Sequence, residues 1–184
     1  VPVPDGGTPA AIGFAQESGI PFELGIIRNH YVGRTFIEPT QQIRAFGVKL
    51  KHSANRAMIE GKRVVLVDDS IVRGTTSVKI VQMIRDAGAT EVHIRVASPM
   101  IFYPDFYGID TPDAEKLLAN QHESLEAMCR FIGADSLAFL SLDGLYHAVG
   151  GEARNDASPQ FTDHYFTGDY PCLLYTSDAA DDMQ

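Results

Sequence analysis

The chain has 184 residues, of which 45% are hydrophobic and 21% charged, and its formal net charge is -9. These values are typical of a soluble globular protein with a single core, and the acidic balance argues against general nucleic-acid binding. No apolar run approaches the roughly 20 residues that span a bilayer. Cys129 and Cys172 are too few for a disulfide framework or a metal cluster. We therefore expect a cytoplasmic protein with no membrane or nucleic-acid partner.

The first elements in chain order surround a glycine-containing turn. Residues 1–3 read as the end of a strand, and residues 4–7 form a turn before Thr8 and Pro9. Thr8 as N-cap with Pro9 at the first helical position predicts a helix that ends near Gly19. Alternating apolar residues predict a strand over 22–26, and a short helix over 55–60 is closed by Gly61.

Apolar runs and helical stripes then alternate to the C-terminal part of the chain. The run over 64–67 has no alternating polar face and predicts a central strand covered on both sides. We expect further elements as follows: helix 78–87, strand 92–96, helix 125–132, strand 137–140 and helix 142–149. This alternation predicts an α/β fold with a doubly wound, mainly parallel sheet.

The segment that follows the central strand suits a phosphorylated sugar. Asp68 and Asp69 come directly after the strand, and ligands of open α/β sheets bind beyond the carboxyl ends of strands. Gly74 allows the backbone to approach a ligand, and hydroxyl residues at a helix start can receive a phosphate. Neither a GxxxxGK[ST] loop nor a GxGxxG fingerprint is present in the sequence.

The distribution of charge agrees with an anionic ligand. Eight of the fifteen Lys and Arg residues lie between Arg28 and Arg63, where the only carboxylates are Glu38 and Glu60. The rest of the chain is strongly acidic. A substrate with several phosphate groups would be drawn to the basic stretch.

Four segments of the sequence carry a family resemblance. VVLVDDSIVRGTTS (64–77) resembles the signature of phosphoribosyltransferases that use phosphoribosyl pyrophosphate (PRPP). RNHYVGRTFIEPTQQIR (28–44), KLKHSANR (49–56) and FYGIDTP (106–112) resemble the glutamine-dependent amidophosphoribosyltransferases of purine biosynthesis in particular. The resemblance runs from residue 1 to about residue 171.

The resemblance implies a domain plan for the chain. It implies a partial type I phosphoribosyltransferase domain over 1–150 that lacks upstream strands and the N-terminal glutaminase domain. A C-terminal extension over 151–171 and a non-native or disordered tail over 172–184 would follow. In this family the segment 28–44 is similar to a flexible loop that closes over the substrate.

The same resemblance implies roles for individual residues in displacement of pyrophosphate from PRPP by ammonia. Asp68 and Asp69 would hold the ribose hydroxyls and bind Mg²⁺, and Arg28 would act with them as a catalytic residue. The expected substrate-binding residues are Ser70, Arg73, Gly74, Thr75, Thr76, Ser77, Lys51, Asp5 and Gly7. The family commonly has Ser or Thr where this chain has Gly6, so no metal role is assigned to that position.

Further partners are implied by the family. Ammonia would come from a missing glutaminase domain, purine nucleotides would inhibit the enzyme, and the intact protein would form a homo-oligomer. Asp105, Thr162 and Tyr165 stand where some relatives have cysteine, so no iron–sulfur cluster is expected. Two alternatives remain: a salvage phosphoribosyltransferase that acts on a free base, and a PRPP-sensing regulatory protein that binds nucleic acid.

Overall fold

The centre of the fold is a parallel sheet, seen in a computed structural model that describes residues 1–29 and 52–172. Its strands are β3 (Arg63–Asp68), β4 (Glu91–Val96) and β5 (Ser136–Phe139), hydrogen-bonded in the order β3-β4-β5. Residues 1–3 run parallel to β3 along its other edge, where the Val3 N–H donates to the carbonyl of Val67 over 2.8 Å. The chain therefore enters the sheet beside β3.

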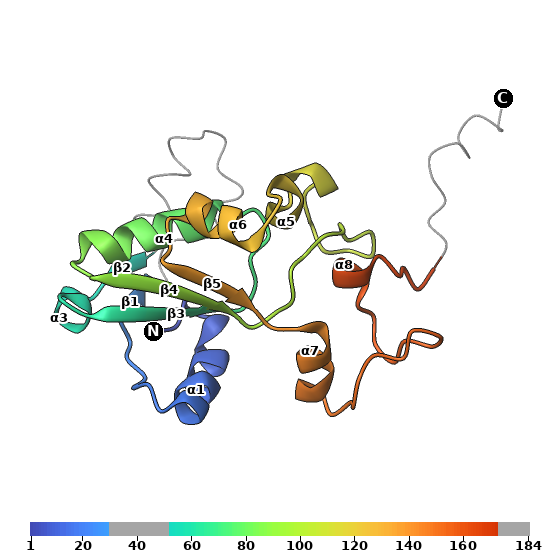
Figure 1. Ribbon diagram of the computed structural model, residues 1–184, viewed down its shortest axis with the longest axis horizontal. Helices are drawn as coiled ribbons and strands as arrows, with labels where there is room; N and C mark the ends of the chain where they lie inside the picture. The colour runs from blue at the N-terminus through green and yellow to red at the C-terminus, as the bar shows by residue number, and fades with distance from the viewer. Residues whose placement is uncertain (30–51, 173–184) are drawn as a thin grey trace.

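Helices cover both faces of this sheet, as Figure 1 shows. On one face lie α4 (Thr75–Asp86) and α6 (Leu125–Ile132), and on the other lies α1 (Gly7–Ser18), while α7 (Leu142–Ala148) lies beyond the carboxyl end of β5. Helix α4 connects β3 to β4, and α6 lies in the connection from β4 to β5, which is the arrangement that crossovers between parallel strands produce. The predicted doubly wound α/β fold is confirmed.

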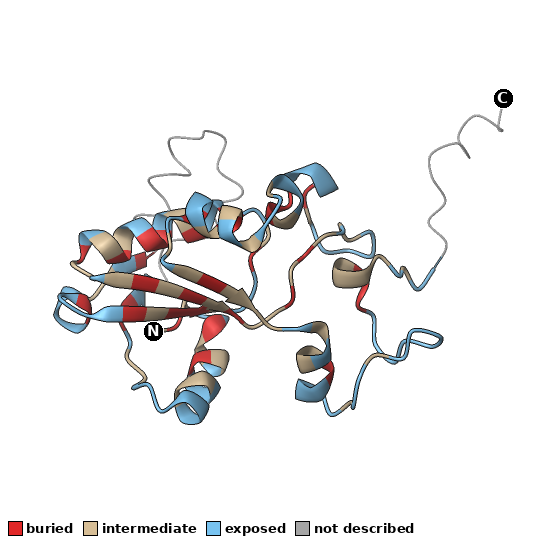
Figure 2. Ribbon diagram, in the orientation of Figure 1, coloured by how far each residue is buried: buried red, intermediate tan, exposed pale blue. Residues whose placement is uncertain are grey.

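The core fills the space between the sheet and the pair α4 and α6. Alternate residues of each strand point to this side because side chains of a strand alternate between faces, and these positions are the buried ones in Figure 2. The buried residues shared by strands and helices are Val64, Leu66, Val92, Ile94, Leu137, Ile80, Val81, Ile84, Met128 and Ile132. The opposite face of β3 is less fully covered, since Val65 is only half-buried.

A second, two-stranded sheet lies beside the first. Strand β1 (Ile26–Arg28) pairs in antiparallel register with β2 (His52–Ala54), and the short helix α3 (Arg56–Ile59) follows. The strand predicted over 22–26 is wrong except for its last residue, because Leu24 is exposed and residues 22–25 have no strand partner in the described part of the chain.

The first helix also starts differently from the prediction. Helix α1 begins at Gly7, and Gly6 already has helical dihedral angles, φ -61° and ψ -39°. Thr8 is therefore inside the helix and does not cap it, because the turn over 4–7 winds directly into the first helical turn. The predicted end is confirmed: Gly19 adopts φ 70° and its N–H donates to the carbonyl of Ala15.

Three short elements remain in the described part of the chain, all of them after β4. They are the 3-10 turn η2 (Ala114–Lys116) and the short helices α5 (Leu118–Gln121) and α8 (His164–Thr167). The N–H groups of Phe102 and Tyr103 both donate to the carbonyl of Tyr165, which attaches α8 to the chain that leaves β4. Among the described residues, every helix is too short or too polar to cross a bilayer.

Candidate functional site

Two loops meet at the carboxyl edge of the sheet. The loop over 4–7 follows residues 1–3, and the turn over 70–77 follows β3, so parallel neighbours deliver both loops to the same edge. A β-carbon on Gly7 would overlap the carbonyl oxygen of Val67, and one on Gly6 would overlap the Asp69 carboxylate. Glycine at both positions is what allows this direct contact between the 4–7 loop and the carboxyl end of β3. The Pro4–Asp5 peptide bond is cis.

Asp68 and Asp69 point to opposite faces of β3. Asp68 lies on the α4 side with Ser77 and Ile80, around a cavity of about 10 Å³, and Asp69 lies against Gly6. Burial raises the pKa of Asp68 to about 7, and the negative charge of Asp69 adds to this effect. A cation beside the pair would favour the ionised form of Asp68 and relieve this repulsion.

The turn over 70–77 forms a cradle of backbone donors. The N–H of Ser70 donates to Asp69 Oδ1 over 2.7 Å, but within the described residues no N–H from 71 to 77 donates a hydrogen bond. These groups lie at the N-terminus of the 12-residue helix α4, which has no side-chain cap. Free N–H groups and the helix dipole at such a place bind anions such as phosphate.

Side chains in the turn have different environments. Ile71 is buried and anchors the turn in the core, whereas Arg73, Thr75 and Thr76 are exposed. Ser77 is buried on the side of the turn that faces Asp68. The exposed hydroxyls are thus available to an incoming ligand, and Ser77 lies beneath it.

Arg28 joins the site from the second sheet. It lies at the end of β1, and its guanidinium forms an ion pair with the carboxylate of Asp5 in the 4–7 loop. The structure therefore brings Asp5, Gly7 and Arg28 together at the first loop, beside Asp69. Lys51 and the loop-like segment 30–44 lie outside the described residues.

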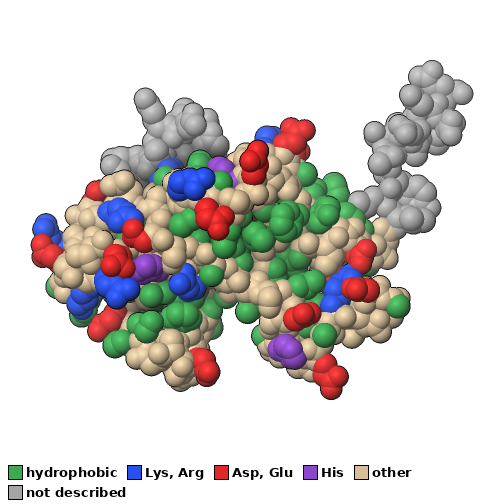
Figure 3. Space-filling view, in the orientation of Figure 1, with side chains coloured by type: hydrophobic (Ala, Val, Ile, Leu, Met, Phe, Trp, Pro, Cys, Tyr) green, Lys and Arg blue, Asp and Glu red, His purple; other side chains and the backbone are tan. Residues whose placement is uncertain are grey.

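The basic stretch predicted from the sequence falls largely in residues that are not described. On the face drawn in Figure 3, Lys and Arg side chains lie among Asp and Glu side chains and form no single basic patch in the described part of the chain. Attraction for an anion at this site therefore rests, among the described residues, on the backbone donors of the turn and the exposed Arg73, with Arg28 already paired.

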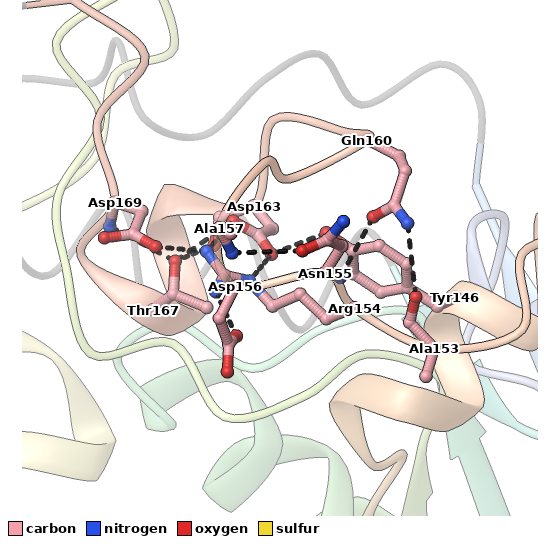
Figure 4. Close-up of polar contacts among 10 residues, drawn as sticks. All are labelled: Tyr146, Ala153, Arg154, Asn155, Asp156, Ala157, Gln160, Asp163, Thr167 and Asp169. Carbon is pink, nitrogen blue, oxygen red and sulfur yellow. Dashed lines mark hydrogen bonds and ion pairs between the residues drawn. The ribbon is translucent and has the colours of Figure 1, made fainter.

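A pocket remote from these loops lies in the C-terminal part of the described chain. It has a volume of about 920 Å³ and is bounded by residues 156–162 and 168–172. Beside it, the buried guanidinium of Arg154 contacts the carboxylates of Asp156, Asp163 and Asp169, as Figure 4 shows. Tyr146 of α7 donates to Asp163 over 2.8 Å. This cluster attaches the extension to α7, and no hydrogen bond or ion pair among the described residues links it to the two loops.

A second buried polar group holds α8. Asp105 accepts a hydrogen bond from the His164 ring over 2.9 Å, and both side chains are 2% exposed. Burial alone would raise the pKa of Asp105, but hydrogen bonds from the Ile109 and Tyr107 N–H groups, Tyr165 and His164 lower it to about 2. The sequence contains no motif for either cluster, because isolated polar residues have no periodicity that reveals a partner.

Comparisons with known proteins agree with this geometry. A family model described as "Phosphoribosyl transferase domain" matches residues 1–98. The amidophosphoribosyltransferase of Rhizobium etli is 87% identical over 174 residues, which are 95% of this chain and 35% of that protein. The amidophosphoribosyltransferase of Bacillus subtilis is 54% identical over 173 residues, 94% of this chain and 36% of that protein.

A solved structure matches the fold over nearly the whole chain. It is described as glutamine phosphoribosylpyrophosphate (PRPP) amidotransferase from B. subtilis complexed with ADP and GMP, and it is 53% identical with a TM-score of 0.82. The match covers 96% of this chain and 38% of that one. This chain thus spans little more than a third of the length of these relatives. It belongs to the family of phosphoribosyltransferase domains, and within it to those of the amidophosphoribosyltransferases.

Proposed function

We propose that this chain is the part of a glutamine-dependent amidophosphoribosyltransferase that binds PRPP and exchanges its pyrophosphate for ammonia. The product is 5-phosphoribosylamine, the first intermediate of purine nucleotide synthesis. The observation that carries the proposal is the meeting of two loops at one sheet edge: the 4–7 loop contacts Asp69, and the 70–77 turn with its free N–H groups directly follows that residue. A ribose that carries a phosphate at one end and a pyrophosphate at the other would place its phosphate in the 70–77 turn and its pyrophosphate at the 4–7 loop.

The reaction needs no nucleophile from the protein, because ammonia attacks the anomeric carbon directly. Positive charge develops on the ribose as pyrophosphate leaves, so catalysis consists of positioning and electrostatic stabilisation. Asp69, exposed at the strand end, accepts hydrogen bonds from the ribose hydroxyls, and its charge stabilises the cationic sugar. The 70–77 turn holds the 5′-phosphate through the N–H groups of 73–76 and the hydroxyls of Thr75 and Thr76.

The pyrophosphate lies against the first loop. The N–H groups of Gly7 and Thr8 already donate to the carbonyls of Val3 and Asp5, so the pyrophosphate would be bound by the N–H groups of Asp5 and Gly6, which donate no hydrogen bond within the described residues. Arg28 and Asp5 form an ion pair at this loop. We propose that Arg28 exchanges its bond to Asp5 for a bond to the leaving group, since an arginine fork suits phosphate oxygens.

The residues present fit a magnesium ion. Asp68 and Asp69 are adjacent carboxylates, one of them with a raised pKa, and Mg²⁺ is commonly held by one or two carboxylates together with substrate phosphates. In the described ranges, no three His, Cys, Asp or Glu side chains gather into a closed metal site. When bound, the ion would neutralise charge on the leaving pyrophosphate. We assign no iron–sulfur cluster, since Asp105 is engaged in hydrogen bonds with His164 and Tyr165.

Other parts of the proposal concern the intact protein. Ammonia would be delivered by a glutaminase domain outside this chain, in a homo-oligomer. Purine nucleotides would bind where the phosphoribosyl group binds, a proposal supported by the B. subtilis relative, whose structure is described as a complex with ADP and GMP. The cytoplasmic location stays a prediction, because some relatives that match this chain are named chloroplastic.

The test is to incubate this chain with PRPP, Mg²⁺ and ammonium and to measure pyrophosphate release, with PRPP binding measured by calorimetry in parallel. We expect binding and ammonium-dependent release, both lost in Asp69→Asn, while Asp110→Asn, an exposed change outside the site, behaves as the unmodified chain. No PRPP binding would refute the proposal. Release that requires a free purine base would favour the salvage alternative, and binding of specific DNA or RNA without turnover would favour the regulatory one.

A further inference from the structure

The 70–77 turn is held from behind by a segment more than forty residues away in the sequence. The N–H of Leu118, the first residue of α5, donates to the carbonyl of Val72 over 2.8 Å. The Leu118 side chain is 1% exposed and belongs to the same core cluster as Ile71. The carbonyl of Val72 is thus bonded within the protein, whereas the N–H groups of residues 71–77 donate no hydrogen bond within the described residues.

The same leucine limits the space behind Gly74. Gly74 adopts φ 74°, and a β-carbon on it would lie 2.9 Å from Leu118 Cδ1 and 3.3 Å from Phe131 Cε1 of α6. Phe131 in turn packs against His122, with ring centroids 4.8 Å apart. The left-handed residue that starts α4 is therefore enclosed by apolar side chains from two other helices.

Helix α5 is itself fixed to the rest of the molecule. The side-chain amide of Asn120 donates to the carbonyl of Phe102 over 2.7 Å and to that of Ala114 over 2.9 Å. The N–H of Phe102 donates to the carbonyl of Tyr165 over 2.9 Å. Figure 1 shows α5 between the sheet and the segment that carries α8. The turn is thus joined to the C-terminal extension through a continuous series of hydrogen bonds.

We propose that α5 is a positioning element for the 5′-phosphate, in which Leu118 sets the shape of the turn and Asn120 holds α5 in place. This inference rests on the proposed function. Between residues 71 and 77 no described backbone N–H is bonded within the protein, so nothing on the ligand side fixes the direction of these donors before a ligand binds. The N–H groups of 75–77 take their direction from helix α4, so it is the donors of 71–74 whose convergence on the anion depends on the contacts at the rear. Such preorganisation contributes directly to affinity.

The test separates the two phosphate groups of the substrate. Ribose 5-phosphate probes the 70–77 turn, and pyrophosphate with Mg²⁺ probes the 4–7 loop, which Leu118 does not contact. We expect Leu118→Ala to weaken the calorimetric affinity for ribose 5-phosphate at least about tenfold, a loss corresponding to one well-made phosphate interaction, and to leave the affinity for pyrophosphate unchanged. Leu118→Met, which keeps the volume, should restore most of the affinity.

A matched core variant controls for general destabilisation. Leu137 of β5 is 6% exposed and lies in the same core, so Leu137→Ala creates a similar cavity without contacting the turn. It should bind both ligands as the unmodified chain does. Asn120→Ala, an exposed substitution that the fold tolerates, should weaken ribose 5-phosphate binding in the same direction as Leu118→Ala.

The outcomes are distinct. If the unmodified chain binds neither ligand, the proposed function is wrong. If it binds ribose 5-phosphate and Leu118→Ala binds it equally well, the positioning role is wrong while the proposed function stands. The positioning role is also wrong if Leu137→Ala loses the same affinity, or if Leu118→Ala weakens both ligands equally.

Discussion

Replacing Asp68 by Asn should stabilise the protein, and by an amount that grows as the pH rises. The carboxyl of Asp68 is half-buried beneath the 70–77 turn, and burial, with the charge of Asp69, raises its pKa from 3.8 to about 7. A group with a raised pKa in the folded state contributes stability that is present below the unfolded pKa and is lost as the pH rises through the folded pKa. The unmodified chain should therefore lose stability between about pH 4 and pH 7.

The magnitude follows from the two pKa values. Their difference of about 3 corresponds to a full effect of about 4 kcal/mol, since one pKa unit is about 1.4 kcal/mol. At about pH 5 the unmodified chain has already lost part of this stability. From about pH 5 to pH 8 its free energy of unfolding should fall by a further amount of about 2.5 kcal/mol. Asn carries no charge and its Oδ1 can keep the hydrogen bond from the Asp69 N–H, now 3.0 Å long, so the variant avoids this loss.

The assay is urea unfolding of both chains at the two pH values. We expect the difference in free energy of unfolding, variant minus unmodified, to increase by about 2.5 kcal/mol from about pH 5 to pH 8. The exposed Asp110→Asn serves as control and should change the free energy of unfolding little at either pH. If the difference in free energy of unfolding between Asp68→Asn and the unmodified chain stays constant with pH, the pKa of the Asp68 carboxyl is not raised by its surroundings and the reasoning is refuted.

Three further predictions follow from other contacts. Arg154→Ala should lower the free energy of unfolding by about 3 to 5 kcal/mol, because it leaves the buried carboxylate of Asp163 without its cation; a loss below about 1 kcal/mol in urea unfolding would contradict this. Gly7→Ala should abolish PRPP binding in calorimetry, because its methyl group overlaps the Val67 carbonyl, a backbone atom that has little room to move; retained affinity would exclude the 4–7 loop from the site. Ser141→Ala should cost about 1 kcal/mol in thermal unfolding by removing the cap of α7, and an unchanged midpoint would mean that water replaces the hydroxyl.

The sequence predicted those parts of the fold that depend on neighbours in the chain. The apolar run before Asp68 and the stop at Gly19 are each decided within a few residues, and both are confirmed. Thr8 shows where such rules fail. Its preference for the N-cap position predicted a helix start at Pro9, but the backbone is already helical at Gly6, so Thr8 lies inside the helix.

The candidate site was predictable in one half only. The segment from Asp68 to Ser77 is continuous, so its pattern shows the strand end, the aspartates and the turn together. The support of the turn by Leu118 and the contact of Gly7 with Val67 join residues far apart in the chain. Leu118 looks like any apolar residue of a short helix, and its partner depends on how the whole chain folds.

The contact between Gly6 and Asp69 has a consequence for how this site can vary among related proteins. A side chain at position 6 and the present orientation of the Asp69 carboxylate would occupy the same volume. A serine introduced at position 6 would therefore require the Asp69 carboxylate, the end of a rotatable side chain, to turn away while the serine adds its own hydroxyl. The orientation of the Asp69 carboxylate thus depends on the residue at position 6, so substitutions at the two positions should be strongly non-additive.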